Sequence, residues 1–222
     1  MPYRNIPFVT NQVYHVFNRS IASQSIFIDR RDYKRILDLI NYYRFKKPPL
    51  RFSHYNRLPK EQKADYEKSF MINQNPMLEI LAYCIMPNHV HFLLRPKIDN
   101  SISDFMRNLQ NGYSKYFNTK RERTGSLFQF MFKAVRIETD EQLVHVSRYI
   151  HLNPVTSYIL KVENLEQYKW SSFKDYVFDM NSFVSKEMIL GRFKSPQKYK
   201  KFVFDQAEYQ RELNKIKHLS LE

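Results

Sequence analysis

The residues best suited to chemistry are two histidines separated by one residue, His89-Val90-His91. Positions i and i+2 of a β-strand point to the same face, so the two imidazoles would project side by side. Such a pair can share one divalent cation, while Val90 would face the packed side of the sheet. Two half-buried histidines can also have this spacing by chance. No HExxH motif or second such pair accompanies it, which argues against a metalloprotease or a zinc hydrolase.

A second set of polar residues has helical spacing. In residues 139–153, a spacing of four places His145, Tyr149 and Asn153 on one face. A tyrosine beside a bound metal is a candidate nucleophile, and the asparagine or the histidine could complete the metal ligands. The alternative is that Tyr149 simply packs between a helix and a sheet, as most helical tyrosines do.

Hydrophobic periodicity predicts the elements that would position these residues. Strands are expected at residues 12–18, 77–87, 89–96 and 126–137, and helices at residues 29–45, 101–119 and 139–153. This order, βαββαβ, is typical of a ferredoxin-like α+β fold. We therefore expect an antiparallel sheet with helices on one face, to which the helix bearing Tyr149 is added.

The expected ends of these elements follow from local residue types. The Pro87-Asn88 pair is suited to a tight hairpin, and Pro154 is expected to end the helix that begins after residue 139. The predicted helix caps are Asp29, Ser101 or Ser103, and Thr139.

The chain is expected to form one domain followed by an extension. Residues 1–176 would be the domain, interrupted by a polar, proline-containing insertion at residues 46–76 with a short helix near 60–70. Residues 177–222 would be a helical extension of unknown role, with helices near 186–192 and 197–216.

Composition restricts the possible partners. The 222 residues include 36 Lys and Arg against 22 Asp and Glu, a net charge of +14 that favours a polyanion such as nucleic acid. With only three glycines, no dinucleotide-binding or P-loop motif is present, and a single Cys84 excludes an internal disulfide. The longest apolar stretch, about residues 80–94, is too short and too polar for a membrane span, and we expect a cytoplasmic protein.

Cations and aromatic residues alternate around the second predicted helix and the strand that follows it. Among the aromatic residues, Tyr113, Tyr116, Phe117 and Phe128 could stack on unpaired bases. The alternative is that Phe128, Phe130 and Phe132 belong to the core, and Trp170 is expected to be a packing anchor. The candidate DNA-binding cations are Arg19, Lys115, Lys120, Arg121, Arg123, Lys133 and Arg136.

Two longer motifs together resemble a known family. IMPNHVHFLL at residues 85–94 and SRYIHLNPV at 147–155 resemble the HUH single-tyrosine transposases, and most closely their REP-associated branch. Further matching pieces are VFNRS, YSKYFN, RTGSLFQFMFKA and YKWSSF, so that the resemblance covers about residues 8–176. The insertion at 46–76 is longer than is typical, and the segment after about residue 177 has no counterpart.

The resemblance implies a function. Such enzymes cut single-stranded DNA beside a hairpin formed by an imperfect palindrome, form a 5′-phosphotyrosine and rejoin the strands without ATP. On this sequence His89 and His91 match the histidine pair and Tyr149 the nucleophile. Asn153 matches the third metal ligand, with His145 as the second choice. The mixed imidazole and amide-oxygen ligands suit Mg²⁺ or Mn²⁺, although imidazole also admits Zn²⁺ or Ni²⁺.

Two alternatives remain beside this DNA transposase. One is a non-catalytic protein that binds single-stranded or hairpin nucleic acid. The other is a nickase like the replication initiators that share the HUH chemistry, although those commonly carry further large modules. REP-associated relatives tend to act as monomers, so we expect a monomer with Tyr149 acting in cis, and a dimer is the alternative.

Overall fold

A four-stranded antiparallel sheet forms the centre of the protein, whose computed structural model describes residues 7–72, 75–178, 180 and 182–207. The strands are β1 (Val13–Arg19), β2 (Leu78–Met86), β3 (His89–Pro96) and β4 (Lys133–Ile137), in the spatial order β2-β3-β1-β4. All three neighbouring pairs are antiparallel. The βαββαβ chain order and this sheet confirm the predicted ferredoxin-like α+β fold.

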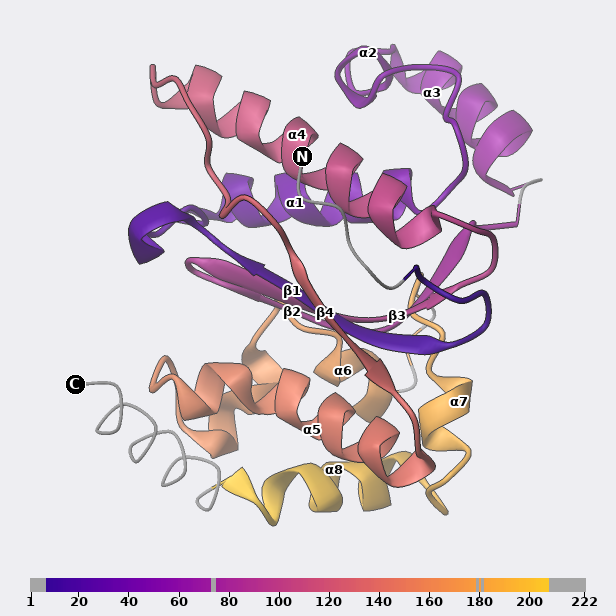
Figure 1. Cartoon of the computed structure of the whole chain (residues 1–222), viewed down its shortest axis with the longest axis vertical. Helices are drawn as coiled ribbons and strands as arrows, with labels where there is room; N and C mark the ends of the chain where they lie inside the picture. Colours follow the sequence, from indigo (N-terminus) through magenta and orange to yellow (C-terminus); the bar gives the residue numbers. More distant parts are fainter. Residues whose placement is uncertain (1–6, 73–74, 179, 181, 208–222) are drawn as a thin grey trace.

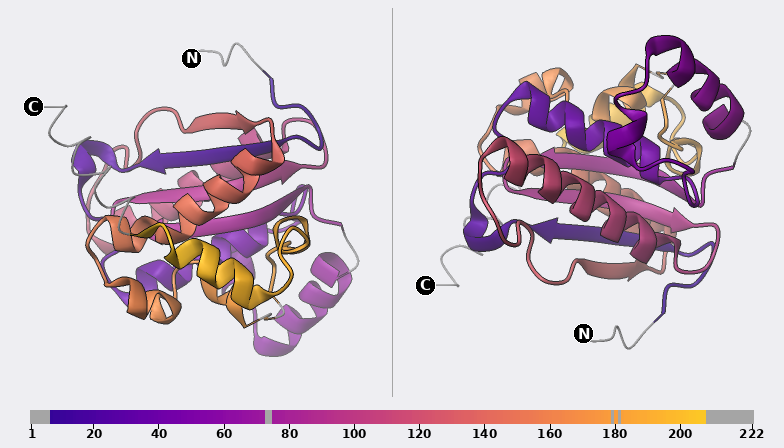
Figure 2. Two further views of the ribbon diagram at one scale, coloured as in Figure 1. Left: turned by 90° about the horizontal axis from the view of Figure 1, so that it is seen from below. Right: turned by 90° about the horizontal axis from the view of Figure 1, so that it is seen from above.

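Helices cover both faces of the sheet (Figure 1). On one face lie α1 (Arg30–Tyr43) and α4 (Ser101–Lys120), the two helices of the βαββαβ unit. The other face carries α5 (Asp140–Thr156) together with three short helices, α6 (Phe173–Val177), α7 (Glu187–Leu190) and α8 (Pro196–Phe204). Figure 2 shows α5 and α8 crossing the sheet from below and α1 and α4 from above. Short 3-10 helices occupy Ile21–Ser23 and Val162–Gln167.

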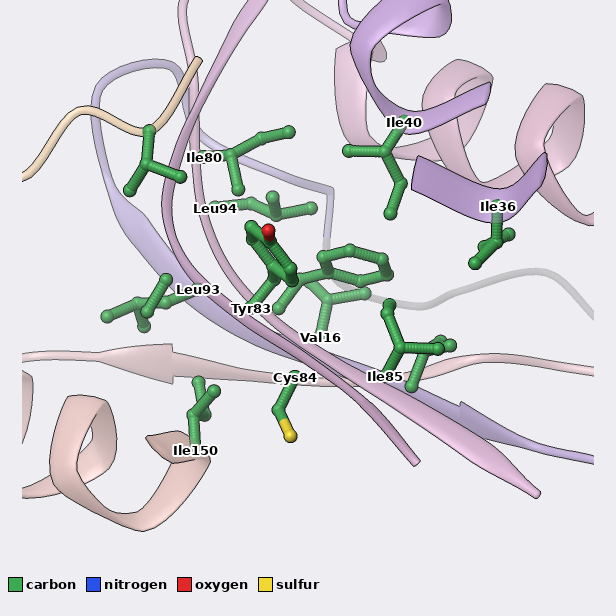
Figure 3. Packing of buried hydrophobic residues seen from close by; sticks show 14 of the residues in the cluster. Val16, Ile36, Ile40, Ile80, Tyr83, Cys84, Ile85, Leu93, Leu94 and Ile150 are labelled. Atoms are coloured by element: carbon green, nitrogen blue, oxygen red, sulfur yellow. The ribbon is translucent and has the colours of Figure 1, made fainter. Parts of the chain in front are cut away.

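The hydrophobic core lies on both sides of the sheet. Val16 and Phe92 are completely buried, and the Phe92 ring meets Phe105 of α4 edge-on at 5.7 Å. Figure 3 shows side chains of α1 on one side of the strands, and Ile150 of α5 with Cys84 on the other. Each fully buried Leu, Ile, Val or Phe contributes about 1.5–3 kcal/mol to folding. The buried Ile150, Leu152 and Val155 therefore help to hold α5 to the sheet.

Two of the three predicted helix caps are correct. The Asp29 carboxylate accepts hydrogen bonds from the backbone of Arg31 and Asp32 at the start of α1, and the Thr139 hydroxyl accepts one from Gln142 at the start of α5. The prediction of Ser101 or Ser103 for α4 is wrong, because the cap position is Asn100. Asn100 has φ 60°, a left-handed conformation that asparagine adopts more readily than most residues do.

The predicted strand at 126–137 is wrong over its first half. Only Lys133–Ile137 forms β4, while Phe128 makes an isolated bridge with Ser20. Because residues 126–132 do not follow a regular pleat, their side chains do not alternate as predicted. Phe128 is buried as expected, and Phe132 packs against the core. The expectation that Phe130 belongs to the core is wrong, since 76% of its surface is exposed.

α5 continues past Pro154, which was expected to end it. Proline lacks a backbone N–H, so the usual hydrogen bond to the carbonyl four residues earlier is missing. The chain turns only after Thr156, where the backbone N–H of Ser157 donates to the Asn153 carbonyl at 3.0 Å. Asn153 therefore lies within the helix, and its position relative to Tyr149 is that of one helical turn.

The insertion at 46–76 folds against α1. It contains α2 (Phe52–Tyr55), α3 (Lys60–Tyr66) and a wider helical turn at Glu67–Ile72, in agreement with the short helix predicted near 60–70. The Tyr42 ring of α1 stacks on Tyr55 with centroids 4.8 Å apart, and the Tyr42 hydroxyl contacts the Tyr66 hydroxyl at 3.0 Å. In the last segment, α7 and α8 correspond to the predicted helices, and residues 208–216 of the second prediction lie outside the described residues.

Candidate active site

The two histidines of β3 lie side by side at one end of the sheet. His89 is opposite Arg19 and His91 is opposite Phe17 on β1, so all four side chains share the face that α5 covers. The rings of His89 and His91 have centroids 5.0 Å apart. Val90 is buried on the opposite face. The shared face expected for the two imidazoles is thus observed.

α5 brings a tyrosine to the same place. The Tyr149 ring meets the His91 ring edge-on with centroids 5.6 Å apart, and 37% of the tyrosine is exposed. One turn later, the Asn153 amide donates to the Tyr149 carbonyl at 3.0 Å. The Asn153 side chain is also within hydrogen-bonding reach of the His89 imidazole and the Tyr149 hydroxyl. Packing of α5 against the strands therefore joins two motifs that are far apart in the sequence.

These side chains line one cavity of about 410 Å³. Its walls come from the end of β1, the start of β3, the segment before β4 and the second half of α5. The lining residues are Phe17, Asn18, Arg19, His89, His91, Gln129, Lys133, Tyr149, Asn153 and Ser157.

A third histidine at this cluster was missed by the sequence analysis. His15 of β1 contacts His91, with 3.0 Å between His15 Nε2 and His91 Nδ1, and its ring lies 5.8 Å from that of Tyr149. The alternation of residues 12–18 could have put His15 on one face together with Phe17. Nothing in the sequence shows that β1 pairs with β3, and that pairing creates the contact.

Burial keeps the imidazoles of this cluster neutral. It lowers the pKa of His15 and that of His89 to about 4, and the nearby charge of Arg19 adds to the lowering at His89. The pKa of His91 is also well below its usual value, again mainly because the ring is buried. Neutral imidazoles keep a lone pair that can bind a metal.

The pKa of the Tyr149 hydroxyl is raised, whereas those of the imidazoles are lowered. Partial burial raises its pKa above the usual value of 10, and the hydrogen bond with Asn153 and the charge of Arg19 only partly offset this effect. At neutral pH the hydroxyl therefore carries its proton. To act as a nucleophile it must lose that proton as the new bond forms.

The other candidate ligand, His145, does not reach the cavity. Its Nδ1 contacts an Arg148 guanidinium nitrogen at 2.6 Å, and its ring meets Phe202 of α8 edge-on. Within the described ranges, no three His, Cys, Asp or Glu side chains come together so as to hold a metal ion by themselves. A cation in the cavity would thus depend on His89, His91 and oxygen ligands such as that of Asn153.

The predicted DNA-binding cations divide into two groups. Arg19 and Lys133 line the cavity. The Lys120 ammonium instead forms ion pairs with Asp29 and the buried Asp32, at 2.7 and 2.6 Å. The remaining four do not line the cavity: Lys115, Arg121, Arg123 and Arg136. Figure 1 shows that the end of α4 and the hairpin between β2 and β3 lie at the same end of the molecule.

Most of the aromatic residues proposed for base stacking are not accessible. Tyr113, Phe117 and Phe128 are buried, and the Tyr113 hydroxyl donates to the Ile26 carbonyl. The Tyr116 hydroxyl donates to the Asp32 carboxylate at 3.0 Å. As predicted, Trp170 packs, stacking on Tyr33 with centroids 4.6 Å apart.

From the sequence, no segment is predicted to span a membrane. In the part of the chain that the structure describes, every helix is too short or too polar to cross a bilayer.

Comparison with known proteins identifies relatives in sequence and in fold. The model of a family described as "Transposase IS200 like" matches residues 55–153. Among solved structures, the chain is similar to a REP-associated tyrosine transposase bound to a REP hairpin, with a TM-score of 0.53 and 16% identity. That match covers 82% of this chain and 89% of the other. A putative transposase from Deinococcus radiodurans R1 matches with a TM-score of 0.35 and 15% identity, over 67% of this chain and 95% of the other. No curated protein matches.

The matched range contains both motifs that line the cavity, PNHVH and RYIHLN. The fold similarity covers 82% of the chain, more than the range that the family model matches. The chain is thus similar to IS200-like transposases over residues 55–153, and the resemblance to transposases that the motifs predicted is confirmed.

Proposed function

We propose that this protein is a metal-dependent transposase that cuts and rejoins hairpin-bearing single-stranded DNA through a 5′-phosphotyrosine on Tyr149. One observation supports this best: Tyr149 and the pair His89 and His91 face the same cavity. Arg19 and Lys133, which can bind phosphate, line that cavity too. The similarity of residues 55–153 to IS200-like transposases agrees with this chemistry.

The residues present fit a divalent cation. His89 and His91 are neutral and face the cavity, and the Asn153 amide oxygen is a suitable third ligand because its nitrogen is engaged with the Tyr149 carbonyl. When bound, Mg²⁺ or Mn²⁺ supplies a Lewis acid that polarises a phosphate oxygen. The small number of protein ligands leaves positions for water and for the DNA.

We propose that His15 fixes the tautomer that such a role requires, by accepting a hydrogen bond from His91 Nδ1. A neutral imidazole has one nitrogen that donates and one with a lone pair. If His91 Nδ1 donates to His15 Nε2, its Nε2 keeps the lone pair for a ligand role. Metal-binding histidines generally use their second nitrogen in this way. His15 is thus a positioning residue that acts through His91.

Tyr149 carries the covalent step. Its hydroxyl oxygen forms a bond to the phosphorus while the bond from phosphorus to the 3′ oxygen breaks, and a proton ends on that 3′ oxygen. Rejoining is the reverse, with a 3′-hydroxyl as the nucleophile. Asn153 supports the tyrosine because its side chain can hydrogen bond the hydroxyl and stabilises the anionic form. Arg19 favours the same form through its charge.

DNA binding is assigned to the predicted cations. Arg19 and Lys133 contact the phosphates at the cut. The hairpin contacts come from the last part of α4 and the turn after it, with Lys115, Lys120, Arg121 and Arg123, while Arg136, opposite Tyr14 toward the start of β1, contacts a more distant flank. The rings of Tyr149 and His91 of one chain lie with centroids 5.6 Å apart, which supports chemistry within a single chain. We therefore propose a monomer with Tyr149 acting in cis.

The test follows end-labelled hairpin oligonucleotides with single-stranded flanks, taken from any imperfect palindromes found beside the coding sequence. With Mn²⁺ or Mg²⁺ we expect a protein–DNA adduct on a denaturing gel, and mass spectrometry should map it to Tyr149. Tyr149→Phe should bind the same DNA without an adduct. Tyr158→Phe is the matched control, since Tyr158 is an exposed tyrosine just beyond the same helix and should react normally.

Two results would contradict the proposal. An adduct that persists in Tyr149→Phe would place the nucleophile elsewhere. Specific hairpin binding without any cleavage, in either metal, would favour the non-catalytic binding protein.

A further inference from the structure

The segment that leads into β4 is irregular but firmly attached. The Leu127 carbonyl accepts a hydrogen bond from the Ile21 backbone at 3.0 Å, and the Gln129 backbone donates to the Arg19 carbonyl at 2.8 Å. The Asn18 amide also donates to the Gln129 carbonyl at 3.1 Å. These bonds attach residues 127–129 to the end of β1, directly beside the cavity. A side chain that follows them is therefore presented in a defined place.

Phe130 is that side chain, and it faces the solvent. It exposes 76% of its surface, whereas Phe128, two residues earlier, exposes 7%. The next residue, Met131, is also exposed. Single exposed apolar residues are common and need no explanation by themselves. The position of Phe130 is what distinguishes it, because Gln129 before it and Lys133 after it both line the cavity.

We infer that Phe130 is a stacking platform for an unpaired base of the DNA strand that enters the cavity. The inference rests on the proposed function and names a residue that would hold its substrate. An aromatic ring next to phosphate-binding cations is the combination that binds single strands, because every base has a π-face and every nucleotide a charge. Arg19 and Lys133 supply the cations, and Phe130 supplies the ring.

Positive charge favours an unpaired DNA base over an apolar protein surface as the partner of Phe130. Phe130 does not itself line the cavity, but Gln129 and Lys133 of the same segment do, and the chain has a net charge of +14. Other rings near the cavity are already engaged: Phe17 packs on His15 and on His91, with centroids 4.9 and 5.5 Å away. An unpaired base satisfies both the ring and the cations, whereas an apolar protein surface would leave the cations without partners.

The experiment measures binding to a fluorescein-labelled oligothymidylate, and to an abasic strand of equal length, by anisotropy. Phe130→Ala should weaken binding to the oligothymidylate roughly fivefold to a hundredfold. It should leave the weaker binding to the abasic strand unchanged. Phe130→Trp should bind like the original protein. Phe178→Ala is the matched control, because Phe178 is 59% exposed but lies in a segment with no residue that lines the cavity, and it should change neither affinity.

A direct readout uses a single tryptophan. Trp170 is the only tryptophan of the chain, so Phe130→Trp combined with Trp170→Phe leaves one reporter at position 130. Its fluorescence should be quenched by the oligothymidylate and not by the abasic strand. No quenching, or an equal loss of affinity for both strands in Phe130→Ala, would overturn the inference.

The outcomes separate this inference from the proposed function. Binding that depends on Phe130, in a protein that forms no adduct, would support the platform and refute the covalent chemistry. An adduct on Tyr149 in a protein whose DNA affinity does not change in Phe130→Ala would support the covalent chemistry and refute the platform. Capture of an apolar peptide by Phe130, with no effect on either strand, would also refute the platform.

Discussion

Two histidines of this protein are almost completely buried and yet differ in what surrounds them. His151 of α5 uses both ring nitrogens within the protein, with the Tyr199 hydroxyl 2.7 Å from Nδ1 and the Ser172 hydroxyl 2.8 Å from Nε2. His91 of β3 contacts His15 through Nδ1, and its ring lines the cavity. Among the described residues, Nε2 of His91 has no hydrogen-bond partner.

The difference shows how to distinguish a structural histidine from a candidate ligand. Burial lowers the pKa of both, that of His151 to about 3, so the protonation state alone does not separate them. The two histidines differ instead in how many of their ring nitrogens have a hydrogen-bond partner within the protein. His151 joins α5 to α8 and to the segment before α6, and so holds the helix that carries Tyr149. His91 has one nitrogen without a hydrogen-bond partner in the described part of the chain, as the proposed ligand role requires.

The largest expected effect is on chemistry at the cavity. His89→Ala and His91→Ala should each abolish adduct formation on hairpin DNA, because the proposed cation site loses one of its two nitrogen ligands. Binding of the DNA should largely remain, since other residues contact the phosphates. Gel assays of adducts, with anisotropy for binding, would check this. EDTA should have the same effect on the original protein, and full activity in EDTA would remove the metal from the mechanism.

The next effect is on stability at the other histidine. His151→Ala removes one buried hydrogen-bond partner from each of the Tyr199 and Ser172 hydroxyls and opens a cavity, and should lower the free energy of unfolding by about 2–4 kcal/mol. Chemical denaturation would measure it. Tyr199→Phe keeps the ring and should cost about 1 kcal/mol. Both variants should still form the adduct below their unfolding temperatures. A folded His151→Ala protein without activity would show that the two histidines are not separable in this way.

A smaller effect is expected at His15. His15→Ala removes the partner of His91 Nδ1, and the loss of such a partner typically weakens metal affinity about 10- to 100-fold. Adduct formation should therefore need more Mn²⁺ but reach a similar extent at saturation. A titration of activity against Mn²⁺ would show the shift, and His15→Gln should partly restore the affinity. A change in maximal rate without a change in the Mn²⁺ requirement would contradict the positioning role.

The smallest expected effect is on the pH dependence of the free energy of unfolding. Because folding lowers the pKa of His151 from about 6.5 to about 3, the unfolded chain binds more protons between these values. The titration of His151 therefore leaves the free energy of unfolding unchanged above about pH 6.5 and lowers it as the pH falls toward 3. His151→Gln should reduce the pH dependence of unfolding by up to about 1.4 kcal/mol per pH unit in that window. Unfolding in EDTA at several pH values would measure it, and equal slopes would contradict the prediction.

The parts of the fold that depend on local pattern could be predicted from the sequence. Alternation placed His89 and His91 on one face, and a Thr followed by acidic residues marked the start of α5. The contact between His15 and His91 could not be predicted, because it needs the pairing of two strands that are far apart in the chain. The same holds for Lys120, whose partner Asp32 belongs to α1. Period-two spacing also failed at Phe130, because residues 126–132 run beside the sheet without joining it.

The direction of α5 adds a consequence of its own. The helix runs from Asp140 to Thr156, so Asn153 and the adjoining Ser157, both at the cavity, mark its carboxyl-terminal end. Aligned peptide dipoles place a partial negative charge, about half an elementary charge, at that end. The field there attracts a cation and repels a phosphate. Arg19 and Lys133 face the same cavity and offset that repulsion, so the polarity of one helix suits the proposed cation while two side chains suit the proposed DNA phosphate.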